Sequence, residues 1–354
     1  MSPALLEAIR WQRAGFRALG CPFYDALCAE LALDVEADGP VARVLAPYAD
    51  ASVEAAYVLR LLGGLHRMVL SGDAPAVAAH FPSTEGDGDA RAAMVGMREL
   101  FTEPPAAVLD AMTRPPQTNE VGRSVALASG MLVVAQELGL PLRLREMGSS
   151  AALNSRLDAY RYEQDGTGWG RPDSPVRFVD LWSGGAPPFS AGMTIVDRRG
   201  CDRDPIDATS GAGALTLLSY VWPEPQERFT RAREAIAMAG ELPVVIDRAD
   251  VLDWLPEQLR EPHPGLALVV FHSVFWQYLP AETQGALRQH LRRAGAAATA
   301  DAPLAWLRLE PNVDNYVPAE LRLTVWNGQT TEPHERLLGT TGFHGGPITW
   351  LAGS

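Results

Sequence analysis

Residues 140–154 read LPLRLREMGSSAALN, and this stretch decides how the rest of the chain is interpreted. An apolar run ends at Glu146, and Gly148 with small residues then leads into a segment with helical spacing. In a sheet with helices on both faces, such a turn lets the backbone approach a ligand, and the following helix supplies free N–H groups. The stretch therefore predicts a first strand with a nucleoside-cofactor loop at its end. A plain tight turn is the alternative.

The glycine content of this loop limits which cofactor it can bind. Dinucleotide fingerprints have three spaced glycines, whereas this loop has Gly148 alone, with Ala152 where a third small residue would stand. The NAD fingerprint is therefore not met. The chain also lacks a G-x-x-x-x-G-K-[ST] phosphate loop and a G-x-S-x-G nucleophile elbow. No motif therefore supports interpretation as a common type of NTPase or hydrolase.

From Leu140 onward, short apolar strands alternate with helical segments, which is typical of a sheet with helices on its faces. Strands are expected at 140–146, 194–202, 242–250, 266–273, 303–310, 321–328 and 346–351. Helices are expected at 150–162, 214–222, 226–240 and 281–295. This order predicts a doubly wound, mostly parallel, Rossmann-like sheet with an antiparallel C-terminal hairpin. An irregular Gly/Pro-rich segment near 165–192, in which 176–184 could form half of a hairpin, is inserted into it.

The part of the chain before this sheet has helical spacing with few β-branched residues. Helices are expected at 4–19, 22–33, 51–72 and 121–139, and the phrase TRPPQTNE breaks the pattern at 113–120. We place a domain boundary near Arg114–Thr118. This gives a helical N-terminal lid or substrate domain at 1–115 and a sheet domain at 116–354.

Composition narrows the class of protein and partner. With 354 residues, 47% of them hydrophobic, the chain can bury a sizeable core. The net charge of -13 repels nucleic acids and anionic membranes, so a small molecule or another protein is the expected partner. The N-terminus lacks the apolar core of a signal peptide, and we expect a cytoplasmic protein. Three cysteines without C-x-x-C spacing and seven scattered histidines indicate no metal site.

Acidic residues follow the second and third expected strands. Asp202 stands where a carboxylate accepts hydrogen bonds from ribose hydroxyls, and Asp204 or Asp207 could cap the next helix. Asp250 could accept from the exocyclic amine of adenine, and a helix N-cap is the alternative. A metal-binding cluster of Asp202, Asp204 and Asp207 for hydrolysis is a third interpretation, although three acids close in sequence rarely converge without further ligands.

The fully apolar strand at 266–273 is expected to lie centrally in the parallel sheet, with its end facing the cleft. His272 near that end could act as a general base or contact the substrate, because the unperturbed pKa of histidine lies near neutrality. The alternative is a hydrogen-bonded structural histidine beside Phe271 and Phe275.

The order of these features resembles that of class I S-adenosylmethionine-dependent methyltransferases. In that superfamily a glycine loop, a ribose acid, an adenine-contacting acid and a catalytic-side strand follow in this sequence, and two final strands form an antiparallel hairpin. The segments 321–328 and 346–351 would match that hairpin, joined by a polar loop that contains Thr330 to Glu335.

In several specific sequence segments, the chain resembles an uncharacterised bacterial family catalogued as domain of unknown function 2332. The resemblance covers most of the chain and rests on QTNEVGRS, REMGSSAALNSRLDAYRY, RRGCDRDPID, YVWPEPQERFTRAREA and VVFHSVFWQYL. Members of the family typically show E-x-G-x-S-A-G-L-N at the loop and G-I-D-L-N-P at the second strand. This chain departs from both, with Ala152 for a glycine, and with Cys201 and Arg203 beside Asp202.

Carried over residue by residue, the resemblance implies an S-adenosylmethionine site. The implied cofactor-binding residues are Glu146, Gly148, Ser150, Asn154, Asp202, Asp250 and Phe271. The implied residues on the reaction side are His272, Glu120 and Arg123. Helix capping by Thr118 or Asn119, with Glu120 favoured by the helix dipole, is the alternative for the 117–123 phrase.

Two functions from different classes remain open. The first is an S-adenosylmethionine-dependent methyltransferase for a small-molecule acceptor, which works by aligning the reactants and excluding water. The second is a non-catalytic ligand-binding or scaffolding protein on the same fold. An enzyme should have an open cofactor crevice. A scaffold should have that crevice filled by side chains, for instance by Met147, Arg203 or Trp254.

Overall fold

The computed structural model describes residues 3–52, 55–312, 318–329 and 333–352. The chain divides into two compact units that interleave along the sequence. A helical unit combines Met1–Thr118 with Thr209–Arg233, and a sheet unit combines Asn119–Ala208 with Glu234–Ser354. Each unit is described separately below.

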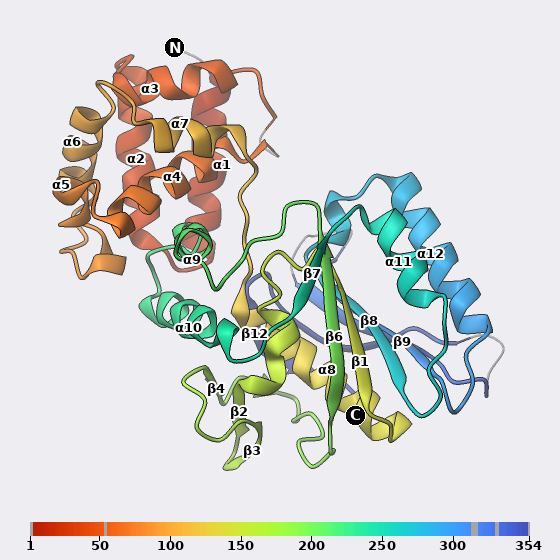
Figure 1. Ribbon diagram of the computed structural model, residues 1–354. Helices are drawn as coiled ribbons and strands as arrows, with labels where there is room; N and C mark the ends of the chain where they lie inside the picture. Colours follow the sequence, from red (N-terminus) through yellow and green to blue (C-terminus); the bar gives the residue numbers. More distant parts are fainter. Residues whose placement is uncertain (1–2, 53–54, 313–317, 330–332, 353–354) are drawn as a thin grey trace. The chain divides into compact units, whose positions relative to one another are not determined.

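The helical unit is built around α4 (Tyr57–Ser71), and the expected all-helical N-terminal region is confirmed (Figure 1). The other helices assigned to it are α1 (Pro3–Ala18), α2 (Pro22–Glu36), α3 (Pro40–Leu45), α5 (Pro75–Ala78), α6 (Ala90–Leu100), α7 (Ala106–Thr113), α9 (Gly211–Ser219) and most of α10 (Gln226–Ala237). Helix α9 packs on α4 at Gly63, where a Cβ would come within 2.3 Å of the Tyr220 ring. Buried His66 on α4 bonds the carbonyl of Ser219 through Nδ1, at 3.1 Å. The chain therefore returns to the helical unit long after it has entered the sheet.

The sheet unit contains a sheet of nine strands and a smaller sheet of three. In chain order the strands are β1 (Leu142–Met147), β2 (Arg161–Gln164), β3 (Thr167–Gly170), β4 (Arg177–Val179), β5 (Trp182–Ser183), β6 (Ile195–Asp202), β7 (Val245–Arg248), β8 (Ala267–Ser273), β9 (Leu304–Pro311), β10 (Ala319–Trp326), β11 (Arg336–Gly342) and β12 (Gly345–Trp350). The large sheet has the order β5-β12-β11-β10-β9-β8-β1-β6-β7, and the small one the order β3-β2-β4.

The large sheet is mostly parallel, as the strand pattern predicted. Strands β7, β6, β1, β8 and β9 run parallel to one another, and β10, β11 and β12 continue the sheet as antiparallel neighbours. From β1 the chain first builds outward through β6 and β7, and it then crosses to the other side of β1 to form β8 and β9. The loops after β1 and β8 therefore leave the same edge and diverge, and we call this place the switch point.

Helices cover both faces of this sheet. Helix α8 (Ser124–Leu138) packs on β9, β10 and β12, whereas α11 (Val251–Leu259) and α12 (Ala281–Ala296) pack on β1, β6, β9 and β10. Helix α8 is apolar on all sides, as expected of a helix buried all round. The segment Val121–Leu138 is long and apolar enough to span a membrane by composition, but 83% of it is buried inside the protein. Gly130 lets it approach the sheet, since a Cβ there would lie 2.5 Å from Leu307.

Two local expectations are wrong. The helix expected at 150–162 is absent: Ser150 and Ala152 have positive φ angles of 52° and 53°, a 3-10 segment spans Asn154–Ala159, and β2 follows. The expected pairing of 321–328 with 346–351 is also wrong, because β11 lies between β10 and β12. Part of the loop expected to join them, Thr330 to Glu332, lies outside the described residues.

Candidate functional site

Three of the eight non-glycine residues with positive φ in the described part of the chain lie at the switch point. Positive φ angles occur at Ser150 and Ala152 in the loop after β1, and at Val274 directly after β8, where φ is 49°. For a β-branched residue such as Val274 this is a true outlier. Each such residue costs about 1–3 kcal/mol and persists only where the surroundings hold it. This edge of the sheet is therefore the first place to look for a functional site.

The Phe275 ring covers the glycine loop. Gly148 has a φ of 66°, and a Cβ at this position would lie 2.1 Å from the ring of Phe275. The backbone N–H of Phe275 donates to Glu310 Oε1 at 3.0 Å, which fixes the ring-bearing residue in place. The surface on which a cofactor was expected to approach the Gly148 backbone is thus covered by an aromatic side chain.

Asp202, the expected ribose acid, holds two loops together. Its Oδ2 accepts from the backbone N–H of Ser150 at 2.9 Å, and its Oδ1 accepts from the N–H of Asp204 at 2.9 Å. The N–H of Ile206 donates back to the Ser150 carbonyl at 3.2 Å. Asp202 therefore bonds the loop of Ser150, but its two oxygens already serve the backbone of the loops after β1 and β6.

Asp250 occupies the position of a helix cap. It accepts from the N–H of Leu252 at 2.9 Å and pairs with Arg203 Nη2 at 2.5 Å. These two contacts lower the pKa of the Asp250 carboxyl. Asp204 in turn pairs with Arg248 at 2.6 Å. Within the described part of the chain, no group of three Asp, Glu, His or Cys side chains is placed to hold a metal ion.

Glu146 is a buried acid at the end of β1. It accepts a hydrogen bond from Ser155 Oγ at 2.6 Å and is 2% exposed. Burial raises the pKa of its carboxyl to about 8, although the Ser155 hydrogen bond and the charge of Arg156 oppose this. Glu146 is therefore largely protonated at neutral pH and carries little charge to offer to a ligand.

The segment before α8 is bound to the loop after β1. The Asn119 side chain accepts from the N–H of Leu153 at 2.8 Å, and Asn154 Nδ2 donates to the Glu120 carbonyl at 3.2 Å. The Glu120 side chain accepts from the N–H of Gly122 at 3.0 Å and thereby caps a 3-10 turn. Asn154 Oδ1 is buried and has no partner among the described residues. Glu120 and Asn154 thus meet, and at least part of their role is to fasten this segment.

Arg123 connects three chain segments. Its Nε donates to the carbonyl of Phe343 at 3.2 Å, and its Nη1 donates to the carbonyl of Ser273 at 3.3 Å. Its guanidinium also lies over the Phe343 ring, 5.7 Å from the centroid. Arg123 therefore joins the start of α8 to the end of β8 and to the β11–β12 turn, where it lies only 6% exposed.

His272 faces the core. Its Nε2 accepts from Trp306 Nε1 at 3.1 Å, and its Nδ1 lies 2.6 Å from Glu310 Oε1. Because the tryptophan N–H can only donate, Nε2 must be the acceptor, and Nδ1 carries the proton that Glu310 accepts. The ring stacks on Trp276 at 5.1 Å. Both nitrogens are engaged, so the geometry favours the structural alternative for His272.

Two residues that hold His272 were missed by sequence reasoning. Trp306 and Glu310 stand four positions apart on β9, hence on the same face, where they meet the His272 ring. An acid at the end of the mostly apolar strand PLAWLRLE was the available signal, since a buried carboxylate needs a partner. Phe271 is fully buried and, as the preceding residue on β8, points to the opposite face from His272.

The family model described as "Uncharacterized protein conserved in bacteria (DUF2332)" matches residues 7–350. The chain belongs to this family. No curated protein and no solved structure matches it. In this DUF2332 member, the switch point thus brings together Ser150 and Asp202, and separately Glu120 and Asn154. Gly148 lies against Phe275, and Asp250 lies with Arg203.

Proposed function

We propose that this DUF2332 member is a ligand-binding or scaffolding protein whose switch point does not hold S-adenosylmethionine. The observation that carries the proposal is the Phe275 ring packed on Gly148. A Cβ added at Gly148 would lie only 2.1 Å from that ring. Backbone at a nucleoside-binding glycine loop has to be approached by the cofactor itself. Here an aromatic side chain of the protein takes that place.

The polar groups of the switch point support the same proposal. Asp202 and Asp250 accept hydrogen bonds from the protein's own N–H groups. Neither carboxylate therefore has both oxygens available to accept hydrogen bonds from a ligand. The loop after β1 leads into a 3-10 segment rather than an α-helix, and the free N–H groups of a helix N-terminus are therefore missing from the place where they would bind a ligand carboxylate.

A methyltransferase is the second candidate, and two observations favour it. The order β7-β6-β1-β8-β9 is the 3-2-1-4-5 order of doubly wound nucleotide-binding sheets. Three strained residues also lie in the loops after β1 and β8, and such residues are common at ligand sites. For this candidate to hold, Phe275 would have to move off Gly148 before the cofactor binds.

Calorimetric titration with S-adenosylmethionine and S-adenosylhomocysteine tests the proposal on three forms: the wild type, Phe275→Ala and Phe275→Leu. The leucine variant is the matched control, because it keeps an apolar group over the loop. We expect no binding heat from any form, with folding checked by circular dichroism. Micromolar binding to the wild type would overturn the proposal.

A separate outcome would establish the second candidate. If Phe275→Ala binds the cofactor, Phe275→Leu does not, and adding Asp202→Asn to the alanine variant abolishes binding, then the crevice is a cofactor site that Phe275 closes. Asp202→Asn is chosen because the amide oxygen can still accept one of the two loop hydrogen bonds.

A further inference from the structure

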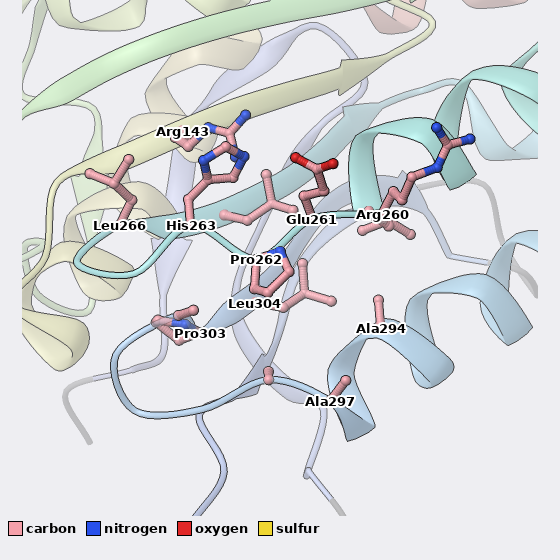
Figure 2. Close-up of a pocket in the computed structure, with 14 residues that line it drawn as sticks. Arg143, Arg260, Glu261, Pro262, His263, Leu266, Ala294, Ala297, Pro303 and Leu304 are labelled. Carbon is pink, nitrogen blue, oxygen red and sulfur yellow. The ribbon is translucent and has the colours of Figure 1, made fainter.

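A second candidate site lies at the opposite, amino-terminal edge of the same strands. A cavity of about 100 Å³, open to solvent on one side, is lined by the start of β1, the loop between α11 and β8, and the loop between α12 and β9 (Figure 2). Its apolar wall and floor consist of Leu259, Leu266, Leu268, Ala294, Ala298 and Leu304. Its polar rim carries Arg143, Arg260, Glu261 and His263. All of these residues belong to the sheet unit.

The sequence explains why the cavity is formed in advance. The phrase EPHPG at 261–265 contains two prolines, which restrict the backbone of one rim loop. The N–H of Gly265 donates to Asp301 twice, to its carbonyl at 2.8 Å and to its Oδ1 at 3.1 Å, so the two loops are fastened to each other. Alanines at 294, 297, 298 and 302 leave the space open. The walls therefore need little ordering when a ligand enters.

The rim presents cationic and anionic groups that the protein leaves available. Arg143 makes one long contact, 3.3 Å from Nε to Asp197 Oδ2, whereas Arg145 holds the same oxygen at 2.5 Å. The two terminal amino groups of Arg143 have no partner among the described residues. Within the same described chain, the side chains of His263 and Glu261 also make no hydrogen bond or ion pair. Figure 2 shows Arg143, His263 and Glu261 along one side of the cavity and Ala294 and Ala297 along the other.

We propose that this cavity binds a small α-amino acid with a short apolar side chain. The guanidinium of Arg143 and the exposed imidazole of His263 match a carboxylate, with which arginine forms strong charge-assisted hydrogen bonds. Glu261 on the same rim matches an ammonium group. The leucines and alanines of the floor accept a short apolar side chain. This inference goes beyond the proposed function, because it concerns the other edge of the sheet.

Ligand-observed NMR titration tests the proposal with three probes that differ only in their charged groups. L-valine carries both charges, isovalerate only the carboxylate, and isobutylamine only the ammonium. We expect L-valine to bind at least about tenfold more tightly than either of the other two, since each charged hydrogen bond contributes a factor of this order.

Four variants assign the contacts. Arg143→Met keeps the length of the side chain, and Glu261→Gln its shape, and each should weaken L-valine binding about tenfold. Ala298→Phe fills the cavity and should abolish binding. The matched control is Arg292→Gln, which should bind normally because Arg292 is exposed on α12 and does not line the cavity. Melting temperatures close to that of the wild type show that each variant is folded.

Three outcomes would overturn the inference. L-valine fails to bind, or it binds equally well to Ala298→Phe, or isovalerate binds as tightly as L-valine and is insensitive to Glu261→Gln. The last result would indicate a site for simple carboxylates. The probes contain no nucleoside, so failure here and failure of the S-adenosylmethionine titration are read independently.

Discussion

The two edges of the β1–β8 strand pair differ in how their polar groups are used. At the carboxyl-terminal edge, Asp202, Asp250 and His272 are engaged by the protein itself, and Phe275 covers Gly148. At the amino-terminal edge, the side chains of Glu261 and His263 have no partner among the described residues and lie beside an apolar cavity. Sheets with this strand order usually bind ligands at the carboxyl-terminal edge of their strands. The contrast teaches that a given chain can instead leave its polar side chains available at the amino-terminal edge. It also predicts that substitutions at the first edge affect stability, and those at the second affect only binding.

The largest effect is expected from Gly148→Val. The substitution forces a β-branched residue into φ of 66° and pushes a Cβ to 2.1 Å from the Phe275 ring. We expect the free energy of unfolding to fall by about 4 kcal/mol, from strain and overpacking together. Urea unfolding followed by tryptophan fluorescence measures it. The matched control is Gly192→Ala, because, apart from the two chain neighbours, no atom of the described residues lies within 4 Å of that Cβ position. If the two variants are equally stable, the switch point is not closed as described.

His272→Ala should have the next largest effect. It leaves Glu310 buried beside the N–H of Phe275 and removes the acceptor for Trp306 Nε1. We expect a loss of about 3 kcal/mol, because partners of a deleted buried group remain unsatisfied. Glu310→Gln, which keeps an acceptor for both N–H groups, should lose about half as much or less. A stable His272→Ala protein with altered ligand binding would instead assign His272 to a functional site.

Glu146→Gln should change the pH dependence of stability. The pKa of Glu146 is raised from 4.5 to about 8, so the folded protein retains this proton over a pH range in which the unfolded chain releases it. The wild type therefore loses stability as the pH rises through this window, while the glutamine variant does not. The difference should grow by up to about 1.4 kcal/mol per pH unit between these two pKa values. Parallel stability curves over this range would show that Glu146 ionises freely in the folded protein.

The smallest effect is expected at the other edge. His263→Ala removes an exposed ring that bonds to no side chain or backbone group in the described part of the chain, so the free energy of unfolding should change by no more than about 0.5 kcal/mol. Thermal unfolding of this variant beside His272→Ala gives the sharpest form of the comparison. A loss of more than about 2 kcal/mol at His263 would remove the distinction between the two edges.

The main strands were predictable because the segments that are buried in the sheet are also short apolar runs in the sequence. Apolar runs such as 266–273 and the acids after β6 and β7 were found where they were expected. The segment 150–162 was not predictable. Its spacing is helical, but Asp202 holds the N–H of Ser150 and Asn119 holds that of Leu153, so hydrogen bonds to distant residues override local preference. The strand β11 was missed for a related reason, since RLLGTTG contains two glycines and becomes a strand only between two neighbours.

The core position of His272 could not be derived from the sequence either. Its partners Trp306 and Glu310 lie more than thirty residues away on β9, and only the register between β8 and β9 brings them together. The sequence could offer both a catalytic and a structural role for the same residue. Which of the two roles applies depends on the groups that form hydrogen bonds with the two ring nitrogens, and these are set by tertiary packing.

The return of Thr209–Arg233 to the helical unit has a practical consequence for anyone who wishes to cut the protein in two. The chain passes between the units three times: after Thr118, after Ala208 and after Arg233. One proteolytic cut at any of these places would not separate the two units, because at least one of the two fragments would still contain segments of both. A truncation that starts at Asn119 would retain α9 without the α4 surface on which it packs, and would expose apolar residues that promote aggregation. A clean sheet-unit fragment requires the excision of residues 209–233 as well.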